Sequence, residues 1–117
     1  MKSFKKLAVE IAELAYDKKC ENIILLDVKK LSGICDFFVI CTVNSESQLS
    51  SVRDTVEDYA SKEYGIQKYS RESVSPNWQT IDLAGIVVHL MTPSAREFYA
   101  LESIWHKARK INWHDKD

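Results

Sequence analysis

Apolar and polar residues follow a clear pattern along the chain, and its strongest element is the run at residues 37–41. This unbroken series of aromatic, β-branched and other apolar residues is too short for a typical helix, and it predicts a central strand buried on both faces. Directly after it, residues 45–48 have the S-x-x-Q pattern, in which the serine accepts a hydrogen bond from a first-turn amide and the glutamine reaches back to the cap. Together they predict a buried strand that leads into an amphipathic helix, the basic unit of a sheet covered by helices.

Helical spacing of apolar residues predicts three helices. The first runs over residues 3–18, and the second over residues 45–65, where a terminal glycine suits the left-handed stop of a helix. The third begins at Thr92 and Pro93, with threonine as the cap and proline at the first helical position. Basic residues within 107–110 suit its carboxyl end. The apolar stripe of this third helix consists of Phe98, Leu101, Ile104, Trp105 and Ala108.

Apolar runs and alternating residues predict four more strands. They are residues 22–28, 66–71, 78–83 and 86–91, with a loop at 72–77. The first should neighbour the central strand, and the last two should form a hairpin through the tight turn at Ala84 and Gly85. The order αββαβββα predicts an α+β fold, a mixed sheet of about five strands with helices packed against it. A length of 117 residues predicts one domain over residues 1–117.

Composition narrows the classes of function. The 16 Lys and Arg residues against 17 Asp and Glu leave a net charge of −1, so the chain lacks the overall positive field of a sequence-independent nucleic-acid binder, although a local patch stays open. No segment approaches the roughly 18 apolar residues of a membrane span, and the amino terminus lacks a signal-like apolar core, which favours a cytoplasmic protein without membrane contact. Three cysteines without CxxC spacing favour reduced core residues, namely Cys20, Cys35 and Cys41.

The sequence shows no catalytic motif. There is no glycine-rich phosphate loop, no G-x-S-x-G, no H-E-x-x-H and no metal-ligand spacing. The strand–turn–helix at residues 42–45 is faintly similar to that of nucleotidyltransferases, but it lacks their glycine, and no D-x-D follows in the next strand to hold magnesium. We therefore expect no enzyme, no catalytic residues, no cofactor and no metal.

Two residues of the predicted hairpin are candidates for chemistry or binding. His89 lies near the end of a strand and close to Asp82 across the hairpin, where a core histidine satisfied by a neighbour is favoured over a catalytic base or a ligand. Trp78 follows a Pro-Asn turn on an outer strand, where it is either half-buried core or an interface anchor. A carboxylate at Asp82 or Glu72 would add selectivity for a basic partner. These residues alone leave both interpretations of Trp78 open.

Several motifs, in order, resemble the ribosomal silencing factor family, also called the Iojap family. Residues 36–42 with Asn44, Ser45 and Gln48 are similar to its D-Y-F-V-I-C-T-G-N-S-x-x-Q signature. Its W-x-x-D, V-V-H and R-x-F-Y-x-L-E-x-L-W motifs are similar to Trp78 with residues 81–83, to residues 87–89 and to residues 96–105. The resemblance covers almost the whole chain. The chain departs from the family pattern at Val43, Ser73 and the pair Ala84-Gly85, which stand for glycine, glycine and G-D.

The resemblance implies a nucleotidyltransferase-like fold without transferase activity. It implies a repressor that binds the large ribosomal subunit through ribosomal protein L fourteen and sterically blocks joining of the small subunit when nutrients are scarce. Carried over residue by residue, it implies a docking surface of Glu72, Trp78, Ile81 and Asp82. Trp78 is the anchor of this surface, and the carboxylates face basic groups. A supporting or secondary contact role is implied for His89, Arg96 and Tyr99.

Other interpretations stay open at this point. A large-subunit assembly factor would use the same docking surface at another time, and a nucleotidyltransferase-like enzyme would bind nucleotide at the turn around Asn44 and Ser45. Family members are often seen as homodimers, and the resemblance leaves a homodimer and a peripheral contact with ribosomal RNA as open possibilities. The sequence decides neither.

Overall fold

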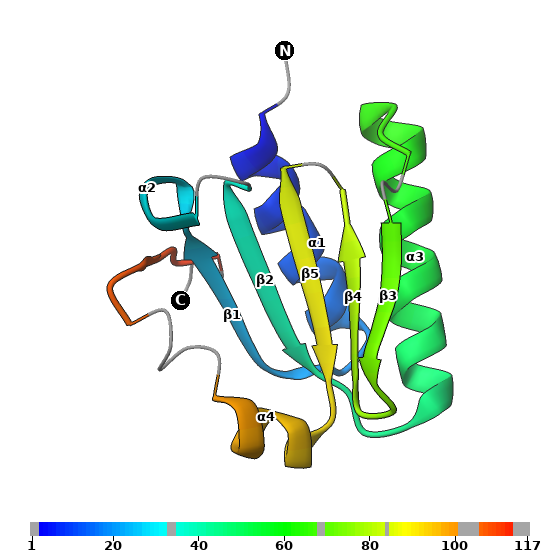
Figure 1. Ribbon diagram of the computed structural model, residues 1–117. Helices are drawn as coiled ribbons and strands as arrows, with labels where there is room; N and C mark the ends of the chain where they lie inside the picture. Colours follow the sequence, from blue (N-terminus) through cyan, green and yellow to red (C-terminus); the bar gives the residue numbers. More distant parts are fainter. Residues whose placement is uncertain (1–2, 33–34, 68–69, 84, 101–105, 114–117) are drawn as a thin grey trace.

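The computed structural model describes residues 3–32, 35–67, 70–83, 85–100 and 106–113 (Figure 1). Its elements are, in order, α1 (Phe4–Asp17), β1 (Glu21–Asp27), α2 (Lys29–Ser32), β2 (Phe37–Thr42), α3 (Glu46–Tyr64), β3 (Ser70–Ser75), β4 (Trp78–Asp82), β5 (Ile86–Met91), α4 (Pro93–Tyr99) and β6 (Arg109–Lys110).

The strands form one mixed sheet in the order β3-β4-β5-β2-β1-β6. β2 lies between β1, which is antiparallel to it, and β5, which is parallel to it, and all six of its residues are buried. The prediction of a central strand buried on both faces is therefore confirmed. The β4–β5 hairpin is confirmed as well. Among the described residues, the mixed sheet has five longer strands, as predicted, and a two-residue sixth strand at its edge.

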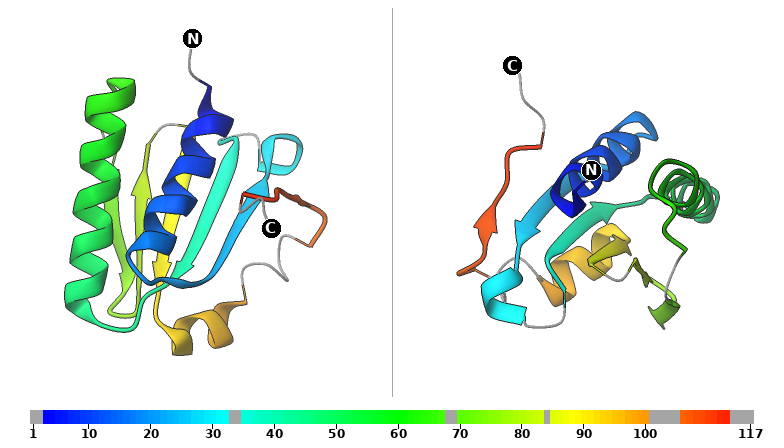
Figure 2. Two further views of the ribbon diagram at one scale, coloured as in Figure 1. Left: turned by 180° about the vertical axis from the view of Figure 1, so that it is seen from behind. Right: turned by 90° about the horizontal axis from the view of Figure 1, so that it is seen from above.

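Two layers of other elements cover the sheet. α1 and α3 lie on one face, while α2 and α4 lie toward the other (Figure 2). Under α1 and α3, apolar side chains of both helices pack on inward residues of the strands in the larger core cluster. The smaller cluster on the opposite face contains Leu26, Phe38, Met91 and Ala95, and Trp78 packs against it. Trp78 thus belongs to the face of the sheet that only short elements cover.

The start of α3 shows how the sequence fixes the joint after β2. The hydroxyl of Ser45 accepts a hydrogen bond from the amide of Gln48 at 3.0 Å, as the S-x-x-Q pattern predicts. The Gln48 side chain accepts from the amide of Asn44 at 2.6 Å, one residue before the expected cap, and donates to the Lys18 carbonyl at 2.9 Å. The helix ends at Gly65 with a left-handed φ of 66°, also as predicted.

β3 lies further along the chain than predicted. Residues 66–67 are not in a strand, and residues 72–75, predicted as a loop, belong to β3. The cause is the hairpin register, in which Ser70 pairs with Asp82 and Ser75 pairs with Trp78, so that two residues suffice for the turn. Cross-strand pairing outweighs the polar composition of this segment.

The third predicted helix is too long. α4 ends at Tyr99 because Ala100 takes a left-handed backbone with φ 48°. Residues 101–105 lie outside the described part of the chain. Arg109 and Lys110, predicted at the end of that helix, instead pair with β1 as β6. Residues 29–32, between β1 and β2, form the short helix α2.

Candidate docking surface

Trp78 and His89 come from neighbouring strands and point to the same face of the sheet. The indole Nε1 of Trp78 donates a hydrogen bond to Nδ1 of His89 at 3.1 Å. In the hairpin register His89 lies opposite Thr80, while Asp82 lies opposite Val87. The prediction of a core histidine satisfied by a neighbour is therefore confirmed, but the hydrogen-bonding neighbour that the structure shows is Trp78 and not Asp82.

His89 is a neutral, fixed hydrogen-bond acceptor. The rings of His89 and Phe38 meet edge to face, with their centroids 4.7 Å apart, and only 6% of His89 is exposed. Burial lowers the pKa of His89 to about 4, because the charged form loses its hydration. Since Nδ1 accepts from Trp78, the proton of the neutral ring is on Nε2. Nε2 is buried and has no hydrogen-bond partner among the described residues.

On its other side, Trp78 contacts α4. The ring of Tyr99 lies 4.6 Å from the indole, centroid to centroid, and Phe98 meets Tyr99 edge-on at 4.9 Å. Phe98 itself is 80% exposed. We call this series, Phe38, His89, Trp78, Tyr99 and Phe98, the aromatic row. It runs from the core of the protein to its surface.

The exposure of Phe98 contradicts the sequence prediction, which placed it in a buried stripe of a long helix. α4 has only seven residues, so the stripe does not continue and Phe98 has no helix beside it to pack on within the described residues. Trp78 was expected on an outer strand, but β4 lies inside the edge strand β3. The indole is half-buried, which keeps part of its surface available.

A groove of about 650 Å³ lies beside the aromatic row, between the β3–β4 turn and α4. The carbonyl of Asn77 accepts a hydrogen bond from the amide of Thr92 at 3.0 Å, which holds the turn against the start of α4. The groove combines aromatic rings with hydroxyl, amide and carboxylate groups, a mixture that suits a protein segment. Its lining includes Ser75, Asn77, Ser94, Glu97, Phe98 and Tyr99.

The structure separates the residues that the sequence grouped as a docking surface. Ile81 is fully buried in the core cluster on the α1 and α3 side, so in this fold it has no exposed surface to offer a partner. Asp82 is on the face of Trp78 but at the far end of β4, roughly 13 Å along the strand. Glu72 pairs through its backbone with Thr80. Its side chain lies outside what the structure describes.

Arg96 supports the fold behind this surface. It is 7% exposed, and its Nη1 donates to the carbonyl of Asn22 at 2.6 Å and to the hydroxyl of Thr42 at 2.9 Å. These bonds connect α4 to the beginning of β1 and the end of β2. Of the two implied roles, support and secondary contact, the geometry favours support.

Other candidate chemistry is sparse. Within the described ranges, no three His, Cys, Asp or Glu side chains lie close enough together to hold a metal ion. None of the described helices is both long and apolar enough to span a membrane. Cys20, Cys35 and Cys41 are buried with free thiols, as the sequence predicted.

Comparison with known sequences gives consistent matches over most of the chain. The family model described as "Ribosomal silencing factor during starvation" matches residues 1–117. Ribosomal silencing factor RsfS of Bacillus subtilis is 34% identical over 108 residues, which cover 92% of this chain and 88% of that protein. The chloroplastic protein Iojap of Arabidopsis thaliana is 38% identical over 105 residues, which cover 89% of this chain and 43% of that longer protein.

Solved structures agree with the fold. A crystal structure of a Chromobacterium violaceum protein superimposes with a TM-score of 0.81 at 26% identity and covers 98% of this chain and 95% of that one. A crystal structure from Bacillus halodurans has a TM-score of 0.71 at 33% identity, over 92% of this chain and 95% of that one.

Proposed function

Because the chain belongs to the ribosomal silencing factor family, RsfS/Iojap, we propose that it binds the large ribosomal subunit through ribosomal protein L fourteen and sterically blocks joining of the small subunit. It thereby represses translation in the cytoplasm under nutrient limitation. Family membership supports a ribosomal role, and the motif resemblance supports this partner.

The observation that carries the proposal is the fixed position of Trp78. Its N–H is held by His89 and its ring by Tyr99, so the indole has little conformational freedom left to lose when a partner binds. Aromatic side chains of this kind are frequent interface hot spots. Since His89 already accepts from Nε1, a partner contacts the remaining indole surface by packing, and Phe98 supplies a second, more exposed ring.

Charge favours a basic partner at this surface. Glu97 lines the groove, and Asp82 lies on the same face at the other end of β4. Acidic groups around an apolar centre select a basic protein surface and speed its approach. This arrangement is consistent with docking on a basic ribosomal protein beside RNA.

Steric blocking of subunit joining requires only that a bound protein occupies space at the interface between the two subunits. The protein measures 38 × 33 × 31 Å, and a body of this size cannot fit between two surfaces that must touch. We therefore propose that silencing is non-catalytic.

Sedimentation of purified ribosomal subunits tests the proposal. In magnesium that normally permits joining, the wild type should travel with the large subunit and suppress the joined peak. Trp78→Ala should bind about thirtyfold more weakly, which corresponds to about 2 kcal/mol for a lost interface tryptophan. Tyr16→Ala, which removes an exposed aromatic ring from α1, should behave as the wild type. A wild type that does not travel with the large subunit would show the proposal to be wrong.

A further inference from the structure

Two segments that are far apart in sequence meet at the β1–β6 edge of the sheet and place five cationic residues along it. Lys29 and Lys30 are in α2, directly after β1, and Lys107, Arg109 and Lys110 are in and before β6. All five residues are exposed. We call them the basic surface.

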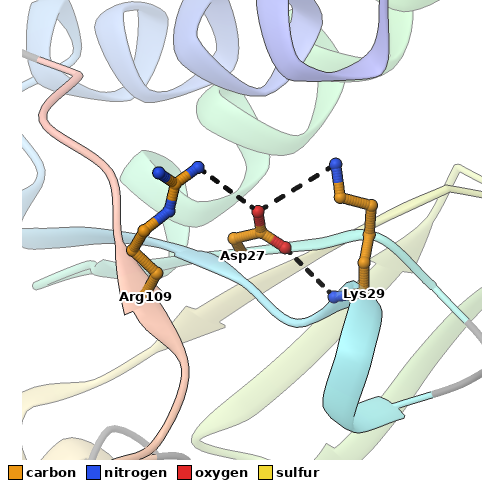
Figure 3. A network of polar contacts seen from close by, with 3 residues as sticks. All are labelled: Asp27, Lys29 and Arg109. Carbon is orange, nitrogen blue, oxygen red and sulfur yellow. Dashed lines mark hydrogen bonds and ion pairs between the residues drawn. The ribbon is translucent and has the colours of Figure 1, made fainter.

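Asp27 joins the two segments of this surface (Figure 3). Its carboxylate lies 4.0 Å from Nζ of Lys29 and 3.6 Å from Nη2 of Arg109, and it accepts the amide of Lys29 at 3.2 Å. The backbone pairing of Asp27 with Arg109 fixes the same arrangement. Asp27 is thus an internal clamp whose side chain is only 17% exposed, and it neutralises one charge.

Within the part of the chain that the structure describes, ion pairs do not neutralise the other lysines of the basic surface, so their charges can interact with a partner. Lys30, Lys107 and Lys110 form no ion pair with any residue in the described ranges. Four of the five cations line one groove together with a single carboxylate, in a chain whose net charge is −1. The positive charge is therefore concentrated locally rather than spread over the molecule.

A groove of about 550 Å³ runs between the two segments. Lysine and arginine side chains form its rim, and Leu31, which is 45% exposed, and Ala108 supply apolar surface. Ala108 also packs against the smaller core cluster, which anchors the second segment on the sheet. A cationic rim around a narrow apolar floor matches a sugar–phosphate strand, with phosphates at the rim and sugars on the floor.

We propose that the basic surface binds the phosphate backbone of RNA on the large ribosomal subunit while the aromatic row contacts protein. This step rests on the proposed function for the source of the RNA. Ala108 packs against the same core cluster as Trp78, whereas Nζ of Lys29 lies over the ring of Phe37 in the larger cluster, so the basic surface lies at the β1–β6 edge of the sheet. β4 and β6 are four strand positions apart, roughly 19 Å, which lets one ribosomal surface contact both.

The composition of the surface favours RNA over a lipid membrane. An interfacial membrane site needs several apolar side chains that insert between lipids. Leu31 is the one exposed large apolar residue among those that line this groove. Exposed, flexible lysines and an arginine are the groups that neutralise nucleic-acid phosphates and release their counterions.

A charge-reversal pair tests the inference. Lys30→Glu with Lys107→Glu changes the rim, and Lys5→Glu with Lys6→Glu makes the same charge change on exposed positions of α1 that do not line the groove. Binding of a fluorescein-labelled RNA hairpin is measured from 50 to 200 mM KCl by anisotropy, and binding of large subunits by sedimentation at the same salts. The rim variant should bind the hairpin at least tenfold more weakly, with a salt slope smaller by about 2, and the α1 variant should stay within twofold of the wild type.

The outcomes of these measurements separate the RNA inference from the proposed function. If the rim variant keeps wild-type affinity and slope, or if the wild type binds no hairpin at 50 mM KCl, the inference is wrong, and the proposed function is judged separately by Trp78→Ala. If the rim variant loses hairpin binding but the wild type ignores large subunits, the RNA surface stands and the proposed function fails. If vesicles of anionic lipid bind the wild type in place of the hairpin, with the same sensitivity to the rim variant, the surface is a membrane site and the inference is overturned.

Discussion

Nδ1 of His89 accepts the indole N–H of Trp78 at 3.1 Å, and this bond requires the imidazole to be neutral. A protonated ring would carry hydrogens on both nitrogens, so its Nδ1–H would face the indole N–H of Trp78, and neither group could accept a hydrogen bond. The position of Trp78 is therefore linked to the charge of a residue that burial keeps uncharged. This link couples the stability of the fold to the geometry of the proposed anchor.

We expect the free energy of unfolding to fall in acid because of His89. Its pKa drops from the ordinary value of 6.5 to about 4 in the folded state, so between these values the unfolded chain binds the proton and the folded one does not. The stabilisation is fully present above pH 6.5 and is lost as the pH falls toward 4. At pH 4.5 the loss amounts to about 2–3 kcal/mol.

Urea unfolding at pH 7.5 and pH 4.5 measures this loss. His89→Phe serves as the reference, because it lacks the titrating group while the carboxylates of the chain titrate as before. The difference between the two pH values should be smaller for His89→Phe than for the wild type by about 2–3 kcal/mol. Equal pH dependence of the two proteins would contradict the buried neutral histidine.

Replacing Arg96 should destabilise the fold rather than weaken ribosome binding directly. Arg96→Met removes two hydrogen bonds from a buried guanidinium to Asn22 and Thr42, and we expect a loss of about 3 kcal/mol in the free energy of unfolding. Lys62→Met, which removes an exposed pair with Asp58, should cost less than about 0.5 kcal/mol. Chemical denaturation of both variants gives the comparison. If the Arg96 variant is as stable as the Lys62 variant, the supporting role assigned here is wrong.

The centre of the fold could be predicted from sequence because its signals are local. The apolar run of β2, the cap at Ser45 and the stop at Gly65 each depend on a few consecutive residues, and the structure has all three. β3 and the segment after α4 were misplaced because their structure depends on distant pairing. β3 takes its register from β4, and Arg109 is drawn into the sheet by β1. No local pattern records either contact.

The candidate site could be predicted only in part, for the same reason. The sequence already made Trp78 a candidate, and alternation along a strand already shows that Ile81, three residues later, faces the other side. That signal was present in the sequence and outweighed by the motif resemblance. The exposure of Phe98 depends on where α4 ends, and the basic surface depends on the β1–β6 pairing. Neither could be found without the fold.

The left-handed stop of α3 gives a test of local backbone physics. Gly65 has φ 66° and open space where a Cβ would be, so Gly65→Ala creates no clash and pays only for the unfavourable conformation. We expect a loss of about 1 kcal/mol in the free energy of unfolding, and about half of this for Gly65→Asn, since asparagine tolerates this region better. Thermal denaturation of the two variants measures the order, and an alanine variant as stable as the asparagine variant would contradict it.

Phe98→Ala gives the sharpest separation of binding from folding. Because the ring is 80% exposed and touches mainly Tyr99, its removal should change the free energy of unfolding by less than about 0.5 kcal/mol. If the aromatic row docks on the large subunit, the same change should weaken binding by at least about tenfold, since a buried interface aromatic contributes more than about 1 kcal/mol. Tyr16→Ala removes another exposed ring, at the end of α1, and should leave binding unchanged. Sedimentation with large subunits and a thermal melt of each variant provide both readouts. If a folded Phe98 variant binds as the wild type does, Phe98 is not part of the contact, because removing a ring from the contact would weaken binding. The docking surface would then be restricted to Trp78 and its immediate neighbours.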